Sequence, residues 1–212
     1  IIDQQMELLK PLGINPDWDT PAPLEAPSTA HASLIRKLDN LTGYVLINPG
    51  GGWPTKRWEP ERYGTLAKRL LDDGLPVAIT WGPGEDDIAS KVQAIAGDRV
   101  RMIPTTLQEL VALCKGARLF VGGDTGPMHF AAAIGTPIVS IFGPTSSDRN
   151  GPFRRKDIVV EQRMDCRPCY ARDTCPLEHL RCLTDISVDH VYEACTRRLE
   201  FDAELTPPNR TL

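Results

Sequence analysis

The chain of 212 residues is 41% hydrophobic, which suffices for one domain of about 100 to 200 residues with extensions. Its 24 Lys and Arg residues against 28 Asp and Glu residues give a formal charge of -4, which argues against a nucleic-acid partner. No apolar run approaches the roughly 18 residues of a membrane-spanning helix, so we expect a soluble chain with no transmembrane segment and no signal peptide.

The first 42 residues predict an extension that precedes the main domain. Residues 2–12 contain several leucines and are expected to form a helix. Residues 13–30 are rich in proline, which predicts an irregular surface connection. The chain begins with Ile1 instead of methionine, and we interpret it as a fragment or a truncated gene product.

Apolar strands alternate with helices beyond residue 43. We predict strands at residues 44–48, 76–80, 100–103, 118–121, 137–142 and 157–160, and helices at 60–71, 86–95, 106–114 and after residue 125. At the helix over 106–114, Thr106 and Glu109 have the spacing of a capping box. This alternation predicts βαβ units. The expected fold class is α/β, a Rossmann-like parallel sheet flanked by helices over residues 43–200, with a tail at 201–212.

Two strand exits carry polar residues suited to a ligand. The strand at 44–48 leads into a glycine-rich loop with two cations, Lys56 and Arg57, and the strand at 118–121 leads into a helix that begins near Thr125. A helix N-terminus combines unpaired N–H donors with a partial positive charge and favours a phosphate. The plainer alternative is a turn in which Asp124 or Thr125 caps the helix. Because ligands of open α/β sheets lie outside the carboxyl ends of the strands, we predict one shared site.

The same two segments carry a family resemblance, and their sequences are NPGGGWPTKRW and GGDTGPMHFAAAIGTPIVSIFGPT. They resemble the C-terminal domain of glycosyltransferase family nine, the bacterial ADP-heptose:lipopolysaccharide heptosyltransferases and their relatives. The resemblance runs from about residue 44 to residue 195. It implies the GT-B architecture, in which two Rossmann-like domains together form the active site. The second domain binds the donor and the first supplies a catalytic carboxylate, so this chain resembles the C-terminal half alone. Residues 1–42 then resemble the end of the preceding domain followed by the interdomain linker.

The resemblance implies an ADP-sugar donor, transfer of heptose or a related sugar to a lipopolysaccharide-core or other glycan acceptor, and no cofactor for the transfer. It also implies a cytoplasmic location, peripheral at the inner membrane, and no transfer by this chain without the missing N-terminal domain. The alternatives are a noncatalytic nucleotide-sugar-binding module, a transferase that uses another nucleotide-sugar, and a GT-B-like sugar-nucleotide epimerase. The DTGPMH signature argues against the epimerase.

The resemblance also assigns roles to individual residues. Lys56 matches the lysine that contacts the donor pyrophosphate and stabilises the leaving diphosphate; the alternative is a solvated loop lysine. Thr125 and Gly126 match positions that hold the diphosphate. Asp124 is expected to bind hydroxyls of the donor sugar. His129 is expected to reach the diphosphate or the sugar, and a buried core histidine is the alternative.

The remaining expected donor contacts lie on two other loops. Gly51 and Gly52 belong to the glycine-rich loop beside Lys56. Glu85 follows the strand at 76–80 and is expected to accept hydrogen bonds from ribose hydroxyls. An exposed glutamate at a helix start is the alternative, because acidic residues favour a first helical turn.

A second constellation is formed by Cys166, Cys169, Cys175 and Cys182, which fall within residues 166–182. Tetrahedral thiolate ligation suits a structural zinc, and His179 lies inside the cluster and could replace one cysteine. An iron-sulfur cluster, reduced thiols and disulfides are the other readings. If the cluster is the functional part, the chain is an interaction protein on an α/β scaffold. The two other cysteines, at 114 and 195, are expected in the core.

Overall fold

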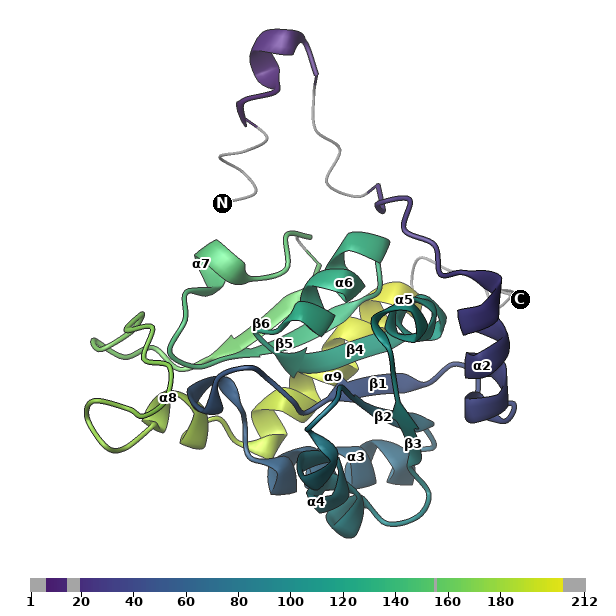
Figure 1. The fold of residues 1–212 in the computed structure, drawn as a ribbon. Coiled ribbons are helices and arrows are strands. Elements are labelled where there is room, and N and C mark those ends of the chain that lie inside the picture. Colours follow the sequence, from purple (N-terminus) through teal and green to yellow (C-terminus); the bar gives the residue numbers. More distant parts are fainter. Residues whose placement is uncertain (1–6, 15–19, 155, 204–212) are drawn as a thin grey trace.

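The computed structural model describes residues 7–14, 20–154 and 156–203. Its centre is a six-stranded sheet in the order β3-β2-β1-β4-β5-β6 (Figure 1). Every neighbouring pair is parallel. The strands are β1 (Val45–Asn48), β2 (Val77–Trp81), β3 (Arg101–Pro104), β4 (Leu119–Gly123), β5 (Ile138–Phe142) and β6 (Ile158–Glu161).

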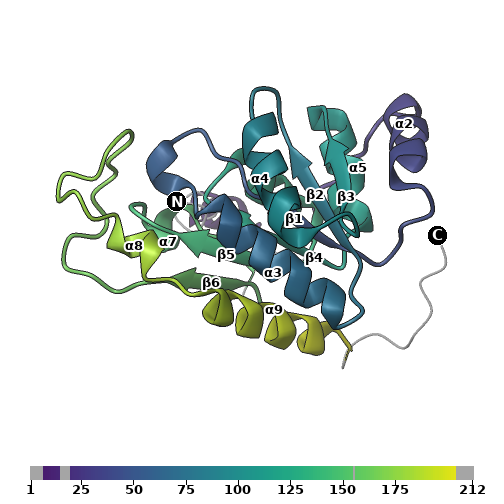
Figure 2. The same cartoon turned by 90° about the horizontal axis from the view of Figure 1, so that it is seen from below.

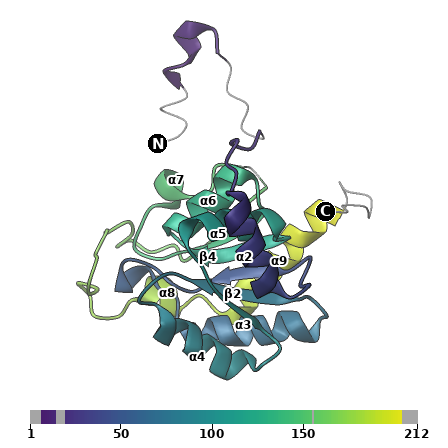
Figure 3. The same cartoon turned by 45° about the vertical axis from the view of Figure 1, so that its right-hand side comes forward.

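Helices cover both faces of the sheet. One face carries α3 (Pro60–Asp72), α4 (Asp86–Ala96) and α9 (Val188–Ala203), and Figure 2 shows α3 and α9 side by side. The other face carries α2 (Ser28–Leu38), α5 (Leu107–Gly116) and α6 (Gly126–Ile134), with α2 against α5 in Figure 3. The short elements are η1 (Lys10–Leu12), η2 (Pro54–Lys56), α7 (Ser147–Asn150) and α8 (Arg181–Thr184).

Successive residues of a strand point to opposite faces of the sheet and pack into the two core layers. In β1, Val45 and Ile47 pack with the α3 and α9 layer, whereas Leu46 packs with the α5 and α6 layer. Strands that are buried on both faces read as continuous apolar runs. That is why the apolar runs in the sequence located the strands.

The predicted fold class is confirmed, and each predicted strand and helix over residues 44–160 is present with ends shifted by one or two residues. The capping box of Thr106 and Glu109 is also confirmed. The stretch expected to be irregular over residues 13–30 is interrupted at Ser28, where α2 begins. Ala30 and Leu34 of α2 are buried against the domain. Of the helix expected at 2–12, residues 2–6 lie outside the described part, and η1 is a 3-10 turn.

The order of the strands creates a switch point between β1 and β4. From β1 the sheet grows one way to β2 and β3, and from β4 it grows the other way to β5 and β6. In doubly wound sheets, ligands bind outside the carboxyl ends of the strands at such a point. The glycine-rich loop after β1 and the start of α6 after β4 are therefore neighbours at this edge. Within the described ranges, no helix has the length and apolar character needed to cross a membrane.

Candidate functional site

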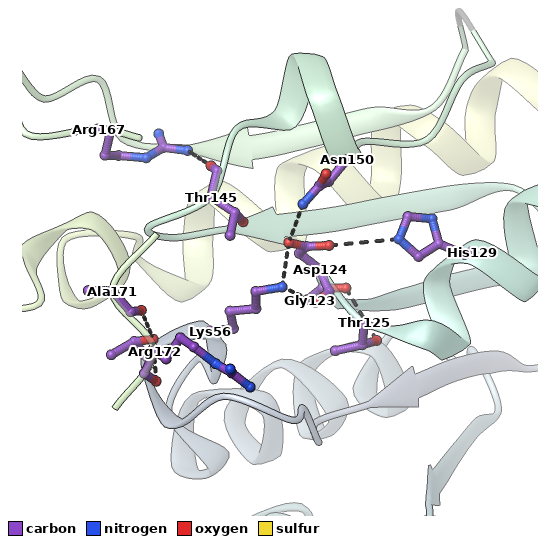
Figure 4. A network of polar contacts seen from close by, with 11 residues as sticks. Lys56, Gly123, Asp124, Thr125, His129, Thr145, Asn150, Arg167, Ala171 and Arg172 are labelled. Carbon is purple, nitrogen blue, oxygen red and sulfur yellow. Dashed lines mark hydrogen bonds and ion pairs between the residues drawn. The ribbon is translucent and has the colours of Figure 1, made fainter. Parts of the chain in front are cut away.

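An ion pair joins the two loops at the switch point. Lys56 Nζ lies 2.8 Å from Asp124 Oδ2, and the side chains are only 13% and 4% exposed (Figure 4). The same ammonium lies 4.2 Å from the centre of the Trp53 ring, a cation–π contact. Lys56 is thus a half-buried, paired cation, and the alternative of a solvated loop lysine is wrong.

Asp124 is held from more than one side. The Asn150 amide of α7 donates to Asp124 Oδ2 at 3.1 Å. Burial alone would raise the pKa of this carboxyl, but the hydrogen bonds from Lys56 and Asn150 outweigh burial and hold the pKa below its ordinary value. Its other oxygen, Oδ1, lies 3.8 Å from His129 Nε2. His129 is 53% exposed at its side chain, so the alternative of a buried core histidine is wrong.

The start of α6 is open. Thr125 occupies the N-cap position with an extended backbone, and its side chain makes no capping hydrogen bond. Its hydroxyl has a long contact of 3.5 Å to the Gly123 carbonyl. A side chain at Gly126 would meet no atom within 4 Å. Thr125 therefore does not cap the helix, and Asp124 is occupied by Lys56 and Asn150.

Glu85 is partly buried and lies against the glycine-rich loop. It accepts hydrogen bonds from the Gly51 N–H at 2.9 Å and the Gly82 N–H at 3.1 Å. A Cβ on Gly50 would lie only 2.3 Å from Glu85 Oε2, so this loop needs glycine where the carboxylate approaches. Arg57 Nε donates to the Gly51 carbonyl at 2.7 Å. Glu85 and Arg57 thus brace the loop.

The expected donor residues fall into two groups. The structure brings Lys56, Asp124, Thr125, Gly126 and His129 together at the switch point. Gly51 joins them, because a Cβ there would lie 3.3 Å from Thr125 Cγ2. Gly52 is exposed and has no atom within 4 Å of such a Cβ. Glu85 lies on the β2 side of the loop and contacts the site through Gly51.

Residues that the sequence analysis missed connect this site to the cysteine-rich segment. The Thr55 hydroxyl donates to the Ala171 carbonyl at 2.5 Å and lies 2.9 Å from the Arg172 carbonyl. Arg167 donates to the carbonyls of Gly143 and Gln162, both at 2.5 Å, and to that of Thr145 at 3.2 Å. These pairs share no local motif, because Thr55 and its partners are 116 and 117 residues apart. Figure 4 shows the contact between Arg167 and Thr145 and the hydrogen bonds to the Ala171 and Arg172 carbonyls.

All six cysteines carry free thiols, and Cys114 and Cys195 are fully buried as expected. Cys166, Cys169, Cys175 and Cys182 line one pocket together with His179. Among the residues that the structure describes, no three Cys, His, Asp or Glu side chains converge closely enough to hold a metal ion as they stand.

Two of these thiols have shifted pKa values. Backbone N–H groups, chiefly those of His179 and Leu180, lower the pKa of Cys175. Burial raises the pKa of Cys182 to about 11, and the thiols of Cys166, Cys169 and Cys175 are near enough to add to that rise. The other three sulfur atoms of the segment therefore lie near Cys182.

Comparison with known proteins gives consistent matches. A family model for glycosyltransferase family 9 (heptosyltransferase) matches residues 1–180. Lipopolysaccharide heptosyltransferase 3 of Escherichia coli K12 is 33% identical over 153 residues, which are 68% of this chain and 44% of the relative.

Two solved structures share the fold. The glycosyl transferase family 9 protein of Veillonella parvula has a TM-score of 0.76 at 22% identity, over 94% of this chain and 59% of that one. An E. coli heptosyltransferase solved with ADP has a TM-score of 0.65 at 23% identity, over 93% and 56%. The chain thus spans less than half of the curated relative and little more than half of each solved one.

Proposed function

Because the chain belongs to glycosyltransferase family 9, we propose that it is the donor-binding domain of a heptosyltransferase. In the complete enzyme, heptose or a related sugar passes from an ADP-sugar to a lipopolysaccharide-core acceptor. The observation that carries this proposal is the Lys56–Asp124 pair beside an open helix start at the switch point of the sheet. That arrangement offers a cation and N–H donors to a diphosphate.

The diphosphate binds between Lys56 and the first turn of α6. As the bond between the sugar and the diphosphate breaks, negative charge grows on the leaving diphosphate. The Lys56 ammonium and the start of α6 stabilise that charge, and both are in place before the reaction begins. The Thr125 hydroxyl, which makes only a long contact inside the protein, donates to a phosphate oxygen.

Asp124 has two tasks in this proposal. Its Oδ2 atom holds Lys56 in position, with Asn150 as a second donor. Its Oδ1 atom faces His129 at the exposed side of the site, where it accepts a hydrogen bond from a hydroxyl of the donor sugar. Glu85 and Gly51 extend the site toward the ribose.

The acceptor site and the base belong to a preceding domain, and the linker to it ends before α2, whose Ala30 and Leu34 are buried against the donor-binding domain. The donor-binding domain therefore includes α2 and continues to the end of α9 at Ala203. We therefore expect the 212-residue chain to bind nucleotide without transferring sugar. The complete enzyme works in the cytoplasm, peripheral at the inner membrane where its lipid-linked acceptor lies.

Nucleotide titration of the purified chain tests the proposal. We expect ADP to bind better than UDP or GDP. We expect Lys56→Ala to weaken ADP binding at least about tenfold, because the variant removes a charge-assisted contact and leaves Asp124 buried without its cation. Calorimetry measures both effects.

The matched control is Lys115→Ala, since Lys115 is an exposed lysine in the last turn of α5, away from the carboxyl ends of the strands. This variant should bind ADP like the wild type. Absence of nucleotide binding by folded protein, or equal affinities for the two lysine variants, would contradict the proposal.

A further inference from the structure

The segment between β5 and β6 brings one amide side chain to the candidate site. Asn150, the last residue of α7, donates from Nδ2 to Asp124 Oδ2 at 3.1 Å. In Figure 4, Asn150 and Lys56 lie on opposite sides of Asp124. The carboxylate is thus held between a cation from the loop after β1 and an amide from the segment after β5.

The ionised carboxylate fixes the orientation of this amide. Hydrogen bonds hold the pKa of Asp124 below its ordinary value, so the group is charged at neutral pH and can only accept. Because only the NH2 group of an amide donates, Asn150 turns its nitrogen toward Asp124 and its carbonyl oxygen away. In the part of the chain that the structure describes, the Asn150 side chain makes no second hydrogen bond. Asn150 is also partly exposed, so its oxygen is available to a ligand.

The turn that carries Asn150 is closed by its own residues. Ser146 Oγ accepts from the Arg149 N–H at 3.3 Å, and the Asn150 N–H donates to the Ser146 carbonyl at 3.0 Å. A Cβ on Gly151 would collide with the Ser147 carbonyl, so glycine lets the chain turn away directly after Asn150. No residue of α7 is buried. The backbone of the turn therefore places the amide at the site without burying it.

The start of the same segment is anchored to the domain. Arg167, with a side chain only 9% exposed, donates to the Gly143 carbonyl at 2.5 Å and to the Thr145 carbonyl at 3.2 Å. The Thr145 hydroxyl is buried and lies close enough to Asp124 to lower the pKa of that carboxyl, yet it has no hydrogen bond of good geometry. Thr145 and Asn150 thus approach Asp124 from the two ends of one short segment.

The strand order places this segment at one end of the proposed donor site. Neighbouring strands follow in the order β2, β1, β4 and β5. The proposed ribose contact at Glu85 follows β2, and the proposed diphosphate contacts follow β1 and β4. The sugar bonded to the second phosphate then comes beside the segment that follows β5. On that side of Asp124, away from Lys56, the carboxylate repels a phosphate and accepts from neutral hydroxyls.

We propose that Asn150 determines which sugar the donor site accepts. Its carbonyl oxygen and Asp124 Oδ1 accept hydrogen bonds from two hydroxyls of the donor sugar, while its Nδ2 keeps the carboxylate oriented. A sugar that lacks a hydroxyl at one of these positions leaves an acceptor unpaired and binds more weakly. The assignment rests on the proposed function, since it takes the diphosphate to lie between Lys56 and the start of α6. Asn150 itself does not contact the nucleotide.

Titration of the 212-residue chain with ADP and with ADP-heptose tests this role, and the readout is the ratio of the two dissociation constants. We expect Asn150→Ala to weaken ADP-heptose binding about three- to tenfold and ADP binding less than about twofold, because it removes hydrogen bonds to neutral sugar hydroxyls alone. The control Asp148→Asn changes an exposed residue of the same turn and should keep the ratio of the wild type. Since α7 has no buried residue, both variants should melt at the temperature of the wild type.

The outcomes separate this role from the proposed function. If ADP binds and Lys56→Ala weakens it, but Asn150→Ala leaves the ratio unchanged, the proposed function stands and the role of Asn150 is refuted. Equal weakening of both ligands by Asn150→Ala would also overturn the role, because Asn150 would then act only by supporting the Lys56–Asp124 pair. Absence of ADP binding by folded wild type would refute the proposed function, and the role of Asn150 with it.

Discussion

Two helices begin at the same edge of the sheet, and their starts are built in opposite ways. At α5, the Thr106 hydroxyl accepts from the Glu109 N–H at 3.3 Å, and Glu109 Oε2 accepts from the Thr106 N–H at 2.9 Å. Ser33 and Lys37 of α2 also donate to Glu109, each at 2.7 Å. At α6, the N-cap Thr125 makes no capping bond. One start is closed by the chain's own side chains, and the other has no side-chain cap; in the proposed function it binds the diphosphate.

The difference between the starts of α5 and α6 distinguishes a helix start that stabilises the fold from one that is suited to bind a ligand. Side chains that complete the donors of a helix start contribute to folding. A helix start without a side-chain cap lacks this contribution to the free energy of folding. Its backbone N–H groups stay available to bind an anion, and a nearby cation favours that binding. The same amino acid, threonine, occupies both N-cap positions. Its surroundings decide which task it has.

The largest expected effect is on binding, from Thr125→Val. This substitution keeps the shape and removes the hydroxyl. We expect ADP affinity to fall roughly tenfold or more, since a hydrogen bond to a charged group is worth about 1.5–3 kcal/mol. The unfolding free energy should change by less than about 0.5 kcal/mol, as for other substitutions that break no strong contact. Unchanged ADP affinity in calorimetry would show that the open start of α6 is not a diphosphate site.

The next effect is a change in how stability depends on pH, from Glu109→Gln. Burial alone raises the pKa of Glu109, but hydrogen bonds from Lys37, the Thr106 backbone and Ser33 outweigh it and lower the pKa from 4.5 to about 2. The stabilisation is therefore complete above pH 4.5 and is lost as the pH falls toward 2. Denaturant unfolding should show a gap between wild type and variant at pH 7 that narrows toward pH 2.

A suitable control for that measurement is Glu61→Gln, which changes an exposed glutamate in the first turn of α3. The control should follow the wild type at both pH values. A gap for Glu109→Gln that stays constant from pH 7 to pH 2 would contradict the contribution of the ionised carboxylate.

The smallest effect is that of Thr106→Val, the same substitution at the closed helix start. It removes the N-cap hydroxyl, and we expect a loss of about 1 kcal/mol in unfolding free energy. ADP affinity should remain that of the wild type. If Thr106→Val and Thr125→Val gave the same pattern in both assays, the two helix starts would not differ in function.

Local signals made much of this fold predictable. The buried strands appear as apolar runs, and the closed start of α5 appears as Thr-x-x-Glu, because both features depend on residues close together in the chain. The start of α2 gave no such signal, since its N-cap is Pro27 with no capping side chain. Its buried face rests on Ala30 and Leu34, which is a weak pattern in a proline-rich stretch.

The sequence predicted individual residues of the candidate site but not the contacts between them. Lys56 was expected at the diphosphate and Asp124 at the donor sugar, yet their ion pair joins residues 68 positions apart through the pairing of β1 with β4. The contacts of Thr55 and Arg167 with distant carbonyls depend on a loop without regular structure. Sequence spacing carries no information about such contacts, so they emerged only from the fold.

In the proposed function, the shared charge of Lys56 has a consequence for the turnover of the complete enzyme. A lone buried ammonium would hold a nucleoside diphosphate tightly both as donor and as product, and slow release would then limit the rate. Asp124 already neutralises Lys56 before any ligand arrives, so the pull on the product is moderated. The charge on the diphosphate is complete only in the released nucleotide, so an unpaired ammonium would bind the product more tightly than the donor, and the Lys56–Asp124 pair reduces that difference.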